Sequence, residues 1–475
     1  MSDAITPNWF AYAALLTWPL VAIALYGSLS KVQATLWTIF GAQMLLPVGA
    51  VIKFPMIPQI DKFTIPNICV LVGCLLSRGR PLKIFSGLGA ATVPLAANLL
   101  APVLSVSGNQ DAIFIGGSGL PPADFYNSGS LVISTFLSLV PFLIGRALIR
   151  QPSDLSELFR IIVITGLAYT LPTLLELRFS PQLHIWLYGY SPTDYVQVLR
   201  GEGYRPMVFM GHGLVLAFFL AVSTMAATAR WNLGIGLGRL PPAVVPSYLG
   251  LILVLCKSFG ATVYALLLTP LIRFTSPRFQ ISVACLLVSV ALSYPLLRSL
   301  DVVPTGLIVQ AADAISSDRA ESLKTRFRNE DALLNRAAER LFFGWGGYGR
   351  NRVFNQESGA DTSLTDGRWI LTMGNYGLLG FIAEFGLLGA GVYRARTVVG
   401  YIRSREERIL LAALALMVAI NIVELLPNST LTPWTWLLAG TLLGTAQQAR
   451  PSSRRFANTP LDSIVSPKRS RDRSS

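Results

Sequence analysis

Apolar residues along this chain gather into blocks of about 17 to 25 positions, separated by shorter polar segments. A helix of that length crosses about 30 Å of hydrocarbon and satisfies its own backbone hydrogen bonds inside the bilayer. The pattern therefore predicts an all-α, polytopic membrane protein with about 12 to 14 transmembrane helices. The predicted spans lie near residues 9–28, 33–52, 64–78, 84–105, 129–149, 158–176, 207–228, 243–257, 260–275, 279–299, 370–393, 409–426 and 432–447.

One pair of spans has two interpretations. Residues 243–257 and 260–275 are short and are joined around Ser258-Phe259-Gly260, so they form either two spans or one broken, re-entrant element. The first span is expected to stay in the protein, because the first 30 residues lack a basic start and a small-residue cleavage site.

Composition agrees with this class. Of 475 residues, 52% are apolar and 13% are charged, against roughly 25% charged in soluble domains. The chain is therefore not an ordinary globular protein. Its cysteines, Cys69, Cys74, Cys256 and Cys285, lie inside predicted spans without metal-ligand spacing, which predicts buried thiols and no disulfide framework.

Basic residues give the chain an orientation. Short linkers rich in Lys and Arg mark the cytoplasmic side of a membrane protein. These linkers contain Arg78, Arg80, Lys83, Arg146, Arg150, Arg394, Arg396, Arg403, Arg405 and Arg408. The segments 106–128, 178–206, 300–369 and 427–431 are then expected to face outward.

Two segments stand apart from the multi-pass domain at 1–447. Residues 448–475 are basic and rich in Ser and Pro, which predicts a disordered cytoplasmic tail that touches anionic headgroups rather than nucleic acid. Residues 300–369 form one long hydrophilic insert, in which residues 322–343 have helical composition but are too short and polar to cross the bilayer. We expect this helical loop over the membrane domain to be functional.

Candidate chemistry lies in three segments at the outer boundary. Residues 203–213 place Arg205 at the mouth of a span and His212 about two turns inside it. A snorkelling arginine and a packed polar residue are the structural alternatives. Residues 326–349 predict a basic amphipathic helix that ends in a glycine-rich turn, where backbone amides can approach a ligand. The alternative is a helix on the bilayer surface that glycine simply terminates.

The third segment, residues 366–380, runs from Asp366 and Arg368 into a span with small residues on one face. Small residues usually indicate close helix packing. Because Asp366 and Arg368 are near the glycine-rich turn in sequence, we expect a shared cleft.

Together these segments resemble the O-antigen ligase and O-antigen polymerase superfamily of bacterial integral membrane glycosyltransferases. As in that family, Arg205 opens a middle span, and Arg326 precedes a Phe-Gly-x-Gly turn (residues 343–346) at the family's spacing. The family's third signature aligns with residues 366–370 and 377–380, and residues 257–260 are similar to its Ser-Arg-Gly stretch. The resemblance covers about residues 200–395.

This resemblance implies a donor glycan on undecaprenyl diphosphate, a glycan or lipid acceptor, and transfer without a metal or other cofactor on the periplasmic face of the bacterial inner membrane. Membrane lipids and polysaccharide-assembly proteins are further expected partners, and no nucleic acid is expected. One departure concerns the family histidine, which is Asp366 here, while its Asn neighbour is Gly367. The ligase branch in particular carries that histidine, so the polymerase branch is favoured and ligation is the alternative.

Site roles follow from the charge of the leaving group. Arg205 and Arg326 are expected to bind the diphosphate, because a guanidinium is always charged and can hold phosphate oxygens in pairs. Asp366 is expected to orient or deprotonate the acceptor hydroxyl, with an exposed loop carboxylate as the alternative. The other predicted substrate-binding residues are Arg328, Arg336, Arg340, Arg368, His212, Lys257, Gly344 and Gly346.

Two other classes of function stay open. Glu176, Lys257, Glu384 and Glu424 lie in or near spans, and charges at membrane depth often mark ion or substrate pathways, as in a transporter or lipid-linked glycan flippase. A non-catalytic partner in polysaccharide assembly is the third class, favoured if Asp366 signifies lost activity.

Overall fold

The computed structural model describes residues 6–54, 57–77, 82–115, 118–200, 203–314 and 316–449. Across these residues the chain is mostly helical, and every predicted span contains a helix. These helices are α1 (Trp9–Ser28), α2 (Lys31–Leu45), α3 (Thr64–Leu76), α4 (Thr92–Ser107), α5 (Phe125–Leu148), α6 (Pro152–Phe179), α9 (Gly213–Asn232), α10 (Val244–Leu255), α11 (Phe259–Phe274), α12 (Pro277–Ser299), α15 (Arg368–Val398), α16 (Arg405–Glu424) and α17 (Pro433–Gln448).

Seven helical segments in the described part are long and apolar enough to cross a membrane. They are Trp9–Ser28, Gly89–Ser107, Ser128–Leu148, Pro152–Phe179, Gly213–Asn232, Pro277–Ser299 and Arg368–Val398. The predicted all-α, multi-pass class is confirmed at this level, whereas the total of 12 to 14 crossings stays a prediction.

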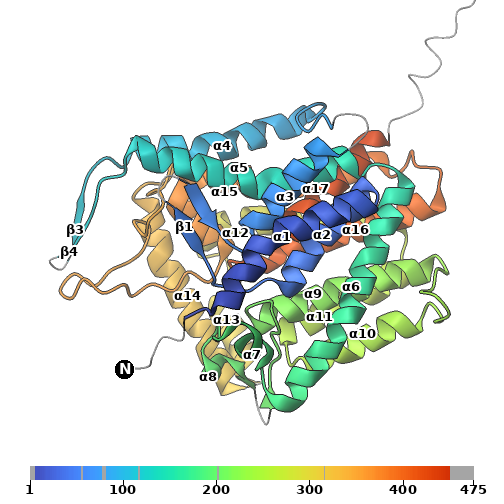
Figure 1. Ribbon diagram of the computed structural model, residues 1–475. Coiled ribbons are helices and arrows are strands. Elements are labelled where there is room, and N and C mark those ends of the chain that lie inside the picture. The colour runs from blue at the N-terminus through green and yellow to red at the C-terminus, as the bar shows by residue number, and fades with distance from the viewer. Residues whose placement is uncertain are drawn as a thin grey trace, which may run out of the picture.

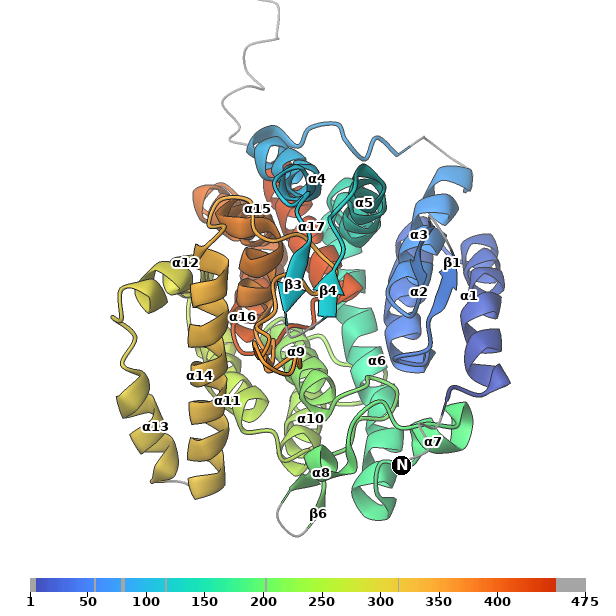
Figure 2. The same ribbon diagram turned by 90° about the vertical axis from the view of Figure 1, so that its left-hand side faces the viewer.

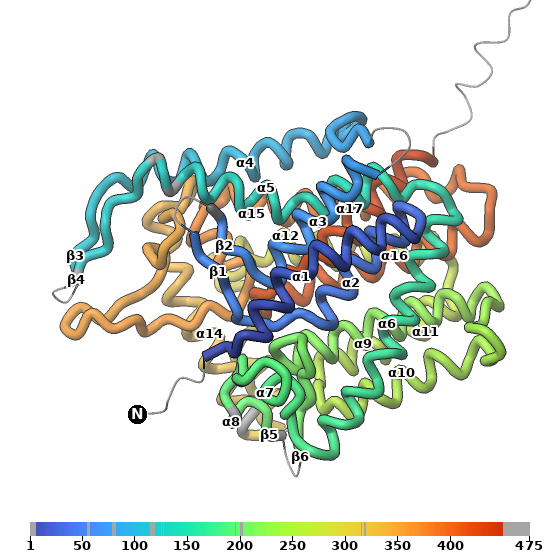
Figure 3. Tube along the Cα trace, viewed as in Figure 1, coloured from blue at the N-terminus to red at the C-terminus, as the bar shows by residue number. Residues whose placement is uncertain are grey.

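Shorter elements lie between these helices. They are the hairpins β1–β2 (Ile52–Phe54, Ile57–Ile60), β3–β4 (Ile113–Ile115, Ser118–Leu120) and β5–β6 (Leu199–Arg200, Gly203–Tyr204), the 3-10 turn η1 (Gly89–Ala91), and helices α7 (Leu183–Tyr188), α8 (Tyr195–Val198), α13 (Thr305–Asp313) and α14 (Ser317–Ala338). Each hairpin is antiparallel. Figures 1 and 3 show the hairpins, α7, α8 and α14 at one end of the bundle. Figure 2, which looks onto that end, shows α13 and α14 beside the other helices.

Basic residues close to helix ends share two cavities. Arg160 and Arg230 line one of them with Glu406, and Arg278 and Arg396 line the other. Arginines from segments that are far apart in the sequence thus line the same cavity. Arg78, Arg80 and the tail from residue 450 lie outside the described residues.

Hydroxyl side chains define where several helices begin. Ser30, Ser276, Ser404 and Thr432 each accept a hydrogen bond from the amide three residues later. Such caps satisfy amides that have no partner within the helix. They explain why α2, α12, α16 and α17 start directly after short polar linkers.

Glycine allows α5 and α17 to pack closely. Gly440 and Gly444 of α17 lie against the backbone of Phe142 and Arg146, and a Cβ at either glycine would overlap those carbonyl groups. From the other side, a Cβ at Gly145 would lie 2.6 Å from the Leu437 carbonyl oxygen. Small residues spaced by four are typical of such close contacts between membrane helices.

Helix α15 is interrupted at Gly377, whose φ of 66° and ψ of −163° are not helical. The glycine-rich turn after α14 docks on this break and satisfies its backbone groups. The amide-to-carbonyl pairs are Trp345 to Gly374, Gly346 to Asn375, Leu378 to Leu341 and Leu379 to Phe342, at 2.7–3.2 Å. The turn therefore fastens the long insert to the bundle.

Several boundaries differ from prediction. Helix α2 ends at Leu45 rather than near 52, and the chain continues into β1. Helix α9 begins only at Gly213, because residues 206–212 form a non-helical turn. Helix α14 is Ser317–Ala338 rather than 322–343. The pair around Lys257 forms two helices, α10 and α11.

The cysteine prediction is confirmed in large part. All four thiols are free, and Cys69, Cys74 and Cys256 are buried while Cys285 is partly exposed.

Gly344→Ala should destabilise the protein by about 1–3 kcal/mol, because residue 344 has a φ of 68° and its new Cβ would lie 2.5 Å from the Asn375 carbonyl carbon. Thermal unfolding of the purified protein in detergent measures this. Gly386→Ala is the matched control in α15, since a Cβ there meets no atom within 4 Å. Equal melting temperatures for the two variants would contradict the assignment of the turn as a structural joint.

Candidate functional site

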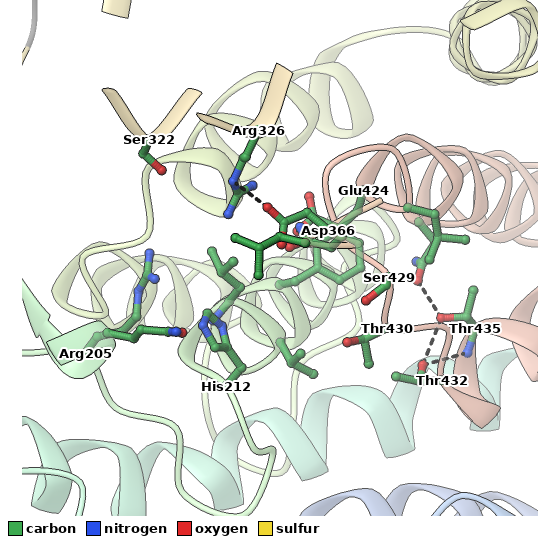
Figure 4. Close-up of a pocket in the computed structure, with 18 of the residues that line it drawn as sticks. Arg205, His212, Ser322, Arg326, Asp366, Glu424, Ser429, Thr430, Thr432 and Thr435 are labelled. Carbon is green, nitrogen blue, oxygen red and sulfur yellow. Dashed lines mark hydrogen bonds and ion pairs between the residues drawn. The ribbon is translucent and has the colours of Figure 1, made fainter. Parts of the chain in front are cut away.

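A cavity of about 750 Å³ lies where the predicted signature segments meet. Arg205, His212, Arg326 and Asp366 all line it, although they come from three separate parts of the sequence (Figure 4). The rest of the lining includes Gln197, the start of α9, one face of α14 and the junction of α16 with α17. Its volume is in the range of small-molecule sites. The predicted shared cleft therefore contains Asp366, but Arg368 and the glycine-rich turn do not line it.

Arg326 and Asp366 are in direct contact. The Arg326 Nε lies 3.5 Å from the Asp366 Oδ2, and the two side chains are 33% and 42% exposed. Arg326 also donates to the Pro427 carbonyl at 3.4 Å. This contact is a single one rather than a bidentate pair, so the guanidinium has further donors.

Buried charge holds the middle of α14 on α12. The Arg298 side chain, 3% exposed, lies 3.4 Å from Glu330 and 2.5 Å from Asp331. Tyr294 also donates to Glu330 at 3.1 Å. Burial raises the pKa of Glu330, an effect that Arg298 opposes. This cluster and the glycine-rich turn together fix the helix that carries Arg326.

The Asp366 loop is tied to the end of α16. The amide of Arg368 donates to the carbonyls of Leu425 and Asn428, at 2.9 and 3.1 Å. A Cβ at Gly367 would overlap the Leu426 carbonyl oxygen. Glycine at 367, where the family has Asn, thus suits this close approach.

Arg205 is buried, with 7% of its surface exposed. Its amide donates to the Val198 carbonyl at 2.8 Å, which continues the β5–β6 pairing. Gly213 packs directly against the Arg205 side chain, and a Cβ at residue 213 would overlap its methylene groups. The glycine after His212 is therefore needed for the path of Arg205 into the cavity.

Two polar side chains of α6, together with Lys62 just before α3, hold the turn between Arg205 and α9. The Glu176 carboxylate accepts the amides of Met207 and Val208 at 2.9 and 2.7 Å. The Tyr169 hydroxyl accepts the Phe209 amide at 3.0 Å. The Lys62 ammonium donates to the Phe209 carbonyl and to the Leu46 carbonyl. Because Lys62 is buried, its pKa is lowered to about 7.

His212 is the N-cap of α9, and its Nδ1 accepts the Leu214 amide at 3.1 Å. An Nδ1 that accepts carries no proton, so the neutral ring is protonated at Nε2. His212 is thus arranged as a hydrogen-bond donor at Nε2 rather than as a proton acceptor there.

The α16–α17 junction adds residues that sequence reasoning missed. Asn428 donates to Glu424 at 2.6 Å, and Thr435 donates to Asn421 at 2.9 Å. Glu424 was recognised only as an ionisable residue near a span. Asn421 and Thr435 carry no motif, and a polar residue inside an apolar helix was the one available signal.

Other predicted site residues do not line the cavity. Arg336 and Arg340 lie 3.4 and 4.4 Å from the Trp345 ring centroid, and Arg340 is 3.1 Å from Asp111. Arg328 is exposed on α14, and Lys257 is exposed between α10 and α11. Their substrate contacts stay predictions, without support from this geometry.

Arg368, Gly344 and Gly346 have structural contacts instead. Arg368 binds Glu384 in a bidentate manner at 2.8 and 2.6 Å, which joins the two halves of interrupted α15. Gly344 and Gly346 belong to the turn that docks on the break. Glu176 and Glu384 are two of the residues considered as pathway charges. Glu384 stabilises the fold by binding Arg368, and Glu176 does so by accepting the amides of Met207 and Val208.

No protein-family model matches the chain, and a search of curated proteins found no match. Among the described residues, no group of three or more His, Cys, Asp or Glu side chains could hold a metal ion. The functional assignment therefore depends on the residues and the cavity themselves.

Glu176→Gln should loosen the turn that carries Arg205 and His212. A neutral amide replaces a carboxylate that accepts three backbone amides, so exchange of amides 207 and 208 should accelerate about tenfold or more. Hydrogen-exchange mass spectrometry of peptides covering 205–212 measures this. Glu157→Gln, at the other end of α6, should leave these peptides unchanged, and equal rates in all three proteins would exclude the positioning role.

Proposed function

We propose that this protein is a membrane glycosyltransferase of surface polysaccharide assembly. Its substrate would be a glycan on undecaprenyl diphosphate, and its reaction would be polymerisation of repeat units on the periplasmic face of the bacterial inner membrane. One observation carries the proposal: Arg205, Arg326 and Asp366, which the family-like segments single out, line one cavity. This agreement between sequence motif and spatial position supports the resemblance to the O-antigen ligase and polymerase superfamily.

The chemistry assigns a role to each of these residues. The acceptor hydroxyl oxygen attacks the anomeric carbon, a new C–O bond forms, and the bond from that carbon to the diphosphate oxygen breaks. The diphosphate leaves with the electron pair, and Arg205 and Arg326 stabilise its growing negative charge. Asp366 accepts the hydroxyl proton, and His212 donates from Nε2 to an oxygen of the substrate.

Donor binding would also release Asp366. Two arginines in the cavity face three carboxylates, those of Glu321, Asp366 and Glu424, so an anion must compete for the guanidinium groups. A diphosphate can bind Arg326 in a bidentate manner, whereas Asp366 makes one contact at 3.5 Å. We infer an exchange in which the donor takes Arg326 and leaves Asp366 available to the acceptor.

The orientation is part of the same proposal. Helices α9 and α15 both begin beside the cavity, since His212 and Asp366 line it. Their last turns carry Arg230 and Arg396, which line two other cavities with Arg160 and Arg278, respectively. Figure 1 shows α8 and α14, which also line the first cavity, at one end of the bundle. On the basis of the positive-inside rule we propose that these basic helix ends face the cytoplasm and that the candidate site faces outward. An outward site suits a substrate that reaches the periplasmic leaflet on its lipid carrier.

Ligation to a lipid or other acceptor remains the alternative reaction. Asp366 in place of the family histidine favours polymerisation. A transporter or flippase is the alternative from another class, and the position of Glu424 in the cavity at the end of α16 is the observation that favours it.

Deletion of the gene in its native host should leave single repeat units on the lipid carrier or lipid core. Wild type should restore long chains, whereas Arg205→Ala and Arg326→Ala should lower polymer formation by about 10²–10³, because each removes stabilisation of the leaving group. Asp366→Ala should also fail to restore long chains. Gel analysis of extracted glycans, at membrane levels matched by immunoblot, measures this, with Glu357→Gln on an exposed loop as the control.

The glycan pattern discriminates between the functions. Full-length polymer that accumulates on the carrier would indicate a ligase. Unchanged glycans with altered solute uptake would exclude both reactions and support a transporter.

Asp366→Asn should tighten binding of inorganic pyrophosphate to the purified protein in nanodiscs by about three- to fivefold, as expected from the loss of a partly exposed ion pair. Isothermal titration calorimetry measures the affinity. Glu321→Gln removes a carboxylate from the same cavity without that pair, so it controls for general charge. A similar gain in both variants, or no gain in Asp366→Asn, would contradict the exchange.

A further inference from the structure

A second cavity, of about 470 Å³, adjoins the first. Gln197, His212, Val215 and Thr430 line both cavities. The rest of its lining is Val48, Phe63, Ser191, Pro192, Thr193, Asp194, Met210 and Gly211. The two cavities thus meet at the residues around His212.

The two cavities differ in charge. The first contains Arg205 and Arg326, whereas no Lys or Arg is among the described residues that line the second. The second instead combines one carboxylate, Asp194, with the hydroxyls of Ser191 and Thr193 and the amide of Gln197. Without a cation this lining disfavours an anion and suits a neutral ligand that carries several hydroxyl groups.

The fold holds the wall of this second cavity in place. The Thr193 hydroxyl donates to the Gly211 carbonyl at 2.5 Å, and the Ser191 hydroxyl donates to the Thr193 carbonyl at 2.7 Å. Gly211 has a φ of 83°, and a Cβ there would lie 2.8 Å from Val48. Residues 191–194 are thereby attached to the same turn that carries His212.

A neutral histidine supports the opposite side of that wall. His184 Nε2 accepts the Val48 amide at 3.3 Å, and its Nδ1 lies 2.8 Å from the Tyr190 carbonyl. Burial lowers the pKa of His184 to about 4, with a further contribution from nearby Lys62. The ring is therefore neutral at physiological pH, and its two bonds connect the segment at Val48 to the one after α7.

We propose that the second cavity binds the acceptor, through a neutral pyranose residue at the end of a glycan. Asp194 accepts hydrogen bonds from sugar hydroxyls, Gln197 both donates and accepts, and Phe63 with Met210 contacts the less polar ring face. This inference rests on the proposed function, since the donor diphosphate then occupies the first cavity. The acceptor hydroxyl would meet the donor's anomeric carbon beside His212, at the residues that the two cavities share.

A hydroxyl-binding site also gives a basis for specificity. A site built to hydrogen-bond a hydroxyl rejects a ligand that lacks it, because its own polar groups are then left unpaired. Residues 191–194 would thus select the acceptor sugar, independently of the arginines that hold the diphosphate.

Two probes test the assignment on the full-length protein in nanodiscs. The first is inorganic pyrophosphate. The second is a phosphate-free oligosaccharide released by mild acid from the host's own surface polysaccharide. Asp194→Asn should weaken oligosaccharide binding by about fivefold or more and leave pyrophosphate binding within about twofold. Arg326→Ala should do the reverse, and Glu357→Gln should change neither.

A steric variant covers the case in which Asp194 contributes little. Ser191→Leu places a larger apolar side chain at the exposed wall of the second cavity, so it should abolish oligosaccharide binding while pyrophosphate still binds. Retained pyrophosphate binding also shows that each variant is folded.

A failure of the acceptor-site inference can be distinguished from a failure of the proposed function. Pyrophosphate binding without any loss of oligosaccharide binding in Asp194→Asn and Ser191→Leu would overturn the second cavity as the acceptor site and leave the proposed function intact. If each variant weakened the binding of both probes equally, the two cavities would form one undivided site, and the assignment of the second cavity as the acceptor site would also be overturned. Binding of neither probe to the wild type would overturn the proposed function together with this inference.

Discussion

The backbone of α15 breaks at Gly377, and the position of α14 over the candidate site depends on how that break is satisfied. Unpaired amides and carbonyls are costly inside a membrane. Here the turn after α14 supplies partners on both sides of the break. The same contact brings α14 onto the bundle, and with it Arg326. The way in which the break in one helix is satisfied thus determines where Arg326 lies.

Several charged groups that the sequence suggested as functional instead stabilise the fold. Glu384 holds Arg368 across the break, and Glu176 holds the turn before α9. What remains at the cavity is a small set in which Arg326 and Asp366 already neutralise each other in part. An anion that bound there would therefore compete with Asp366 for Arg326, and the strength of its binding would depend on the carboxylates as much as on the arginines.

The sequence predicted the helices well because apolar blocks of membrane-spanning length have few alternatives in lipid. It predicted their ends less well, since residues 206–212 are shaped by Glu176, Tyr169 and Lys62, which are distant in the chain. Arg205, Arg326 and Asp366, which the motifs single out, line one cavity, whereas Arg368 and the glycine-rich turn, predicted to share a cleft with Asp366, do not. Gly344 and Gly346 lie instead in a turn that docks on the backbone of α15. Sequence alone does not distinguish a glycine that lets a ligand approach from one that lets another backbone approach. Asn421 and Thr435 have no sequence signature for a site.

The contact between α5 and α17 has a consequence for biosynthesis. Gly440 and Gly444 close α17, the last helix of the described residues, on the backbone of a helix made some 300 residues earlier. Trp434 and Thr435 of α17 complete a wall of the cavity. The nascent chain can insert its helices in order, but this seam forms only after α17 has left the ribosome. A premature stop before α17 would leave the face of α5 around Phe142, Gly145 and Arg146 open to lipid and the cavity without one of its walls.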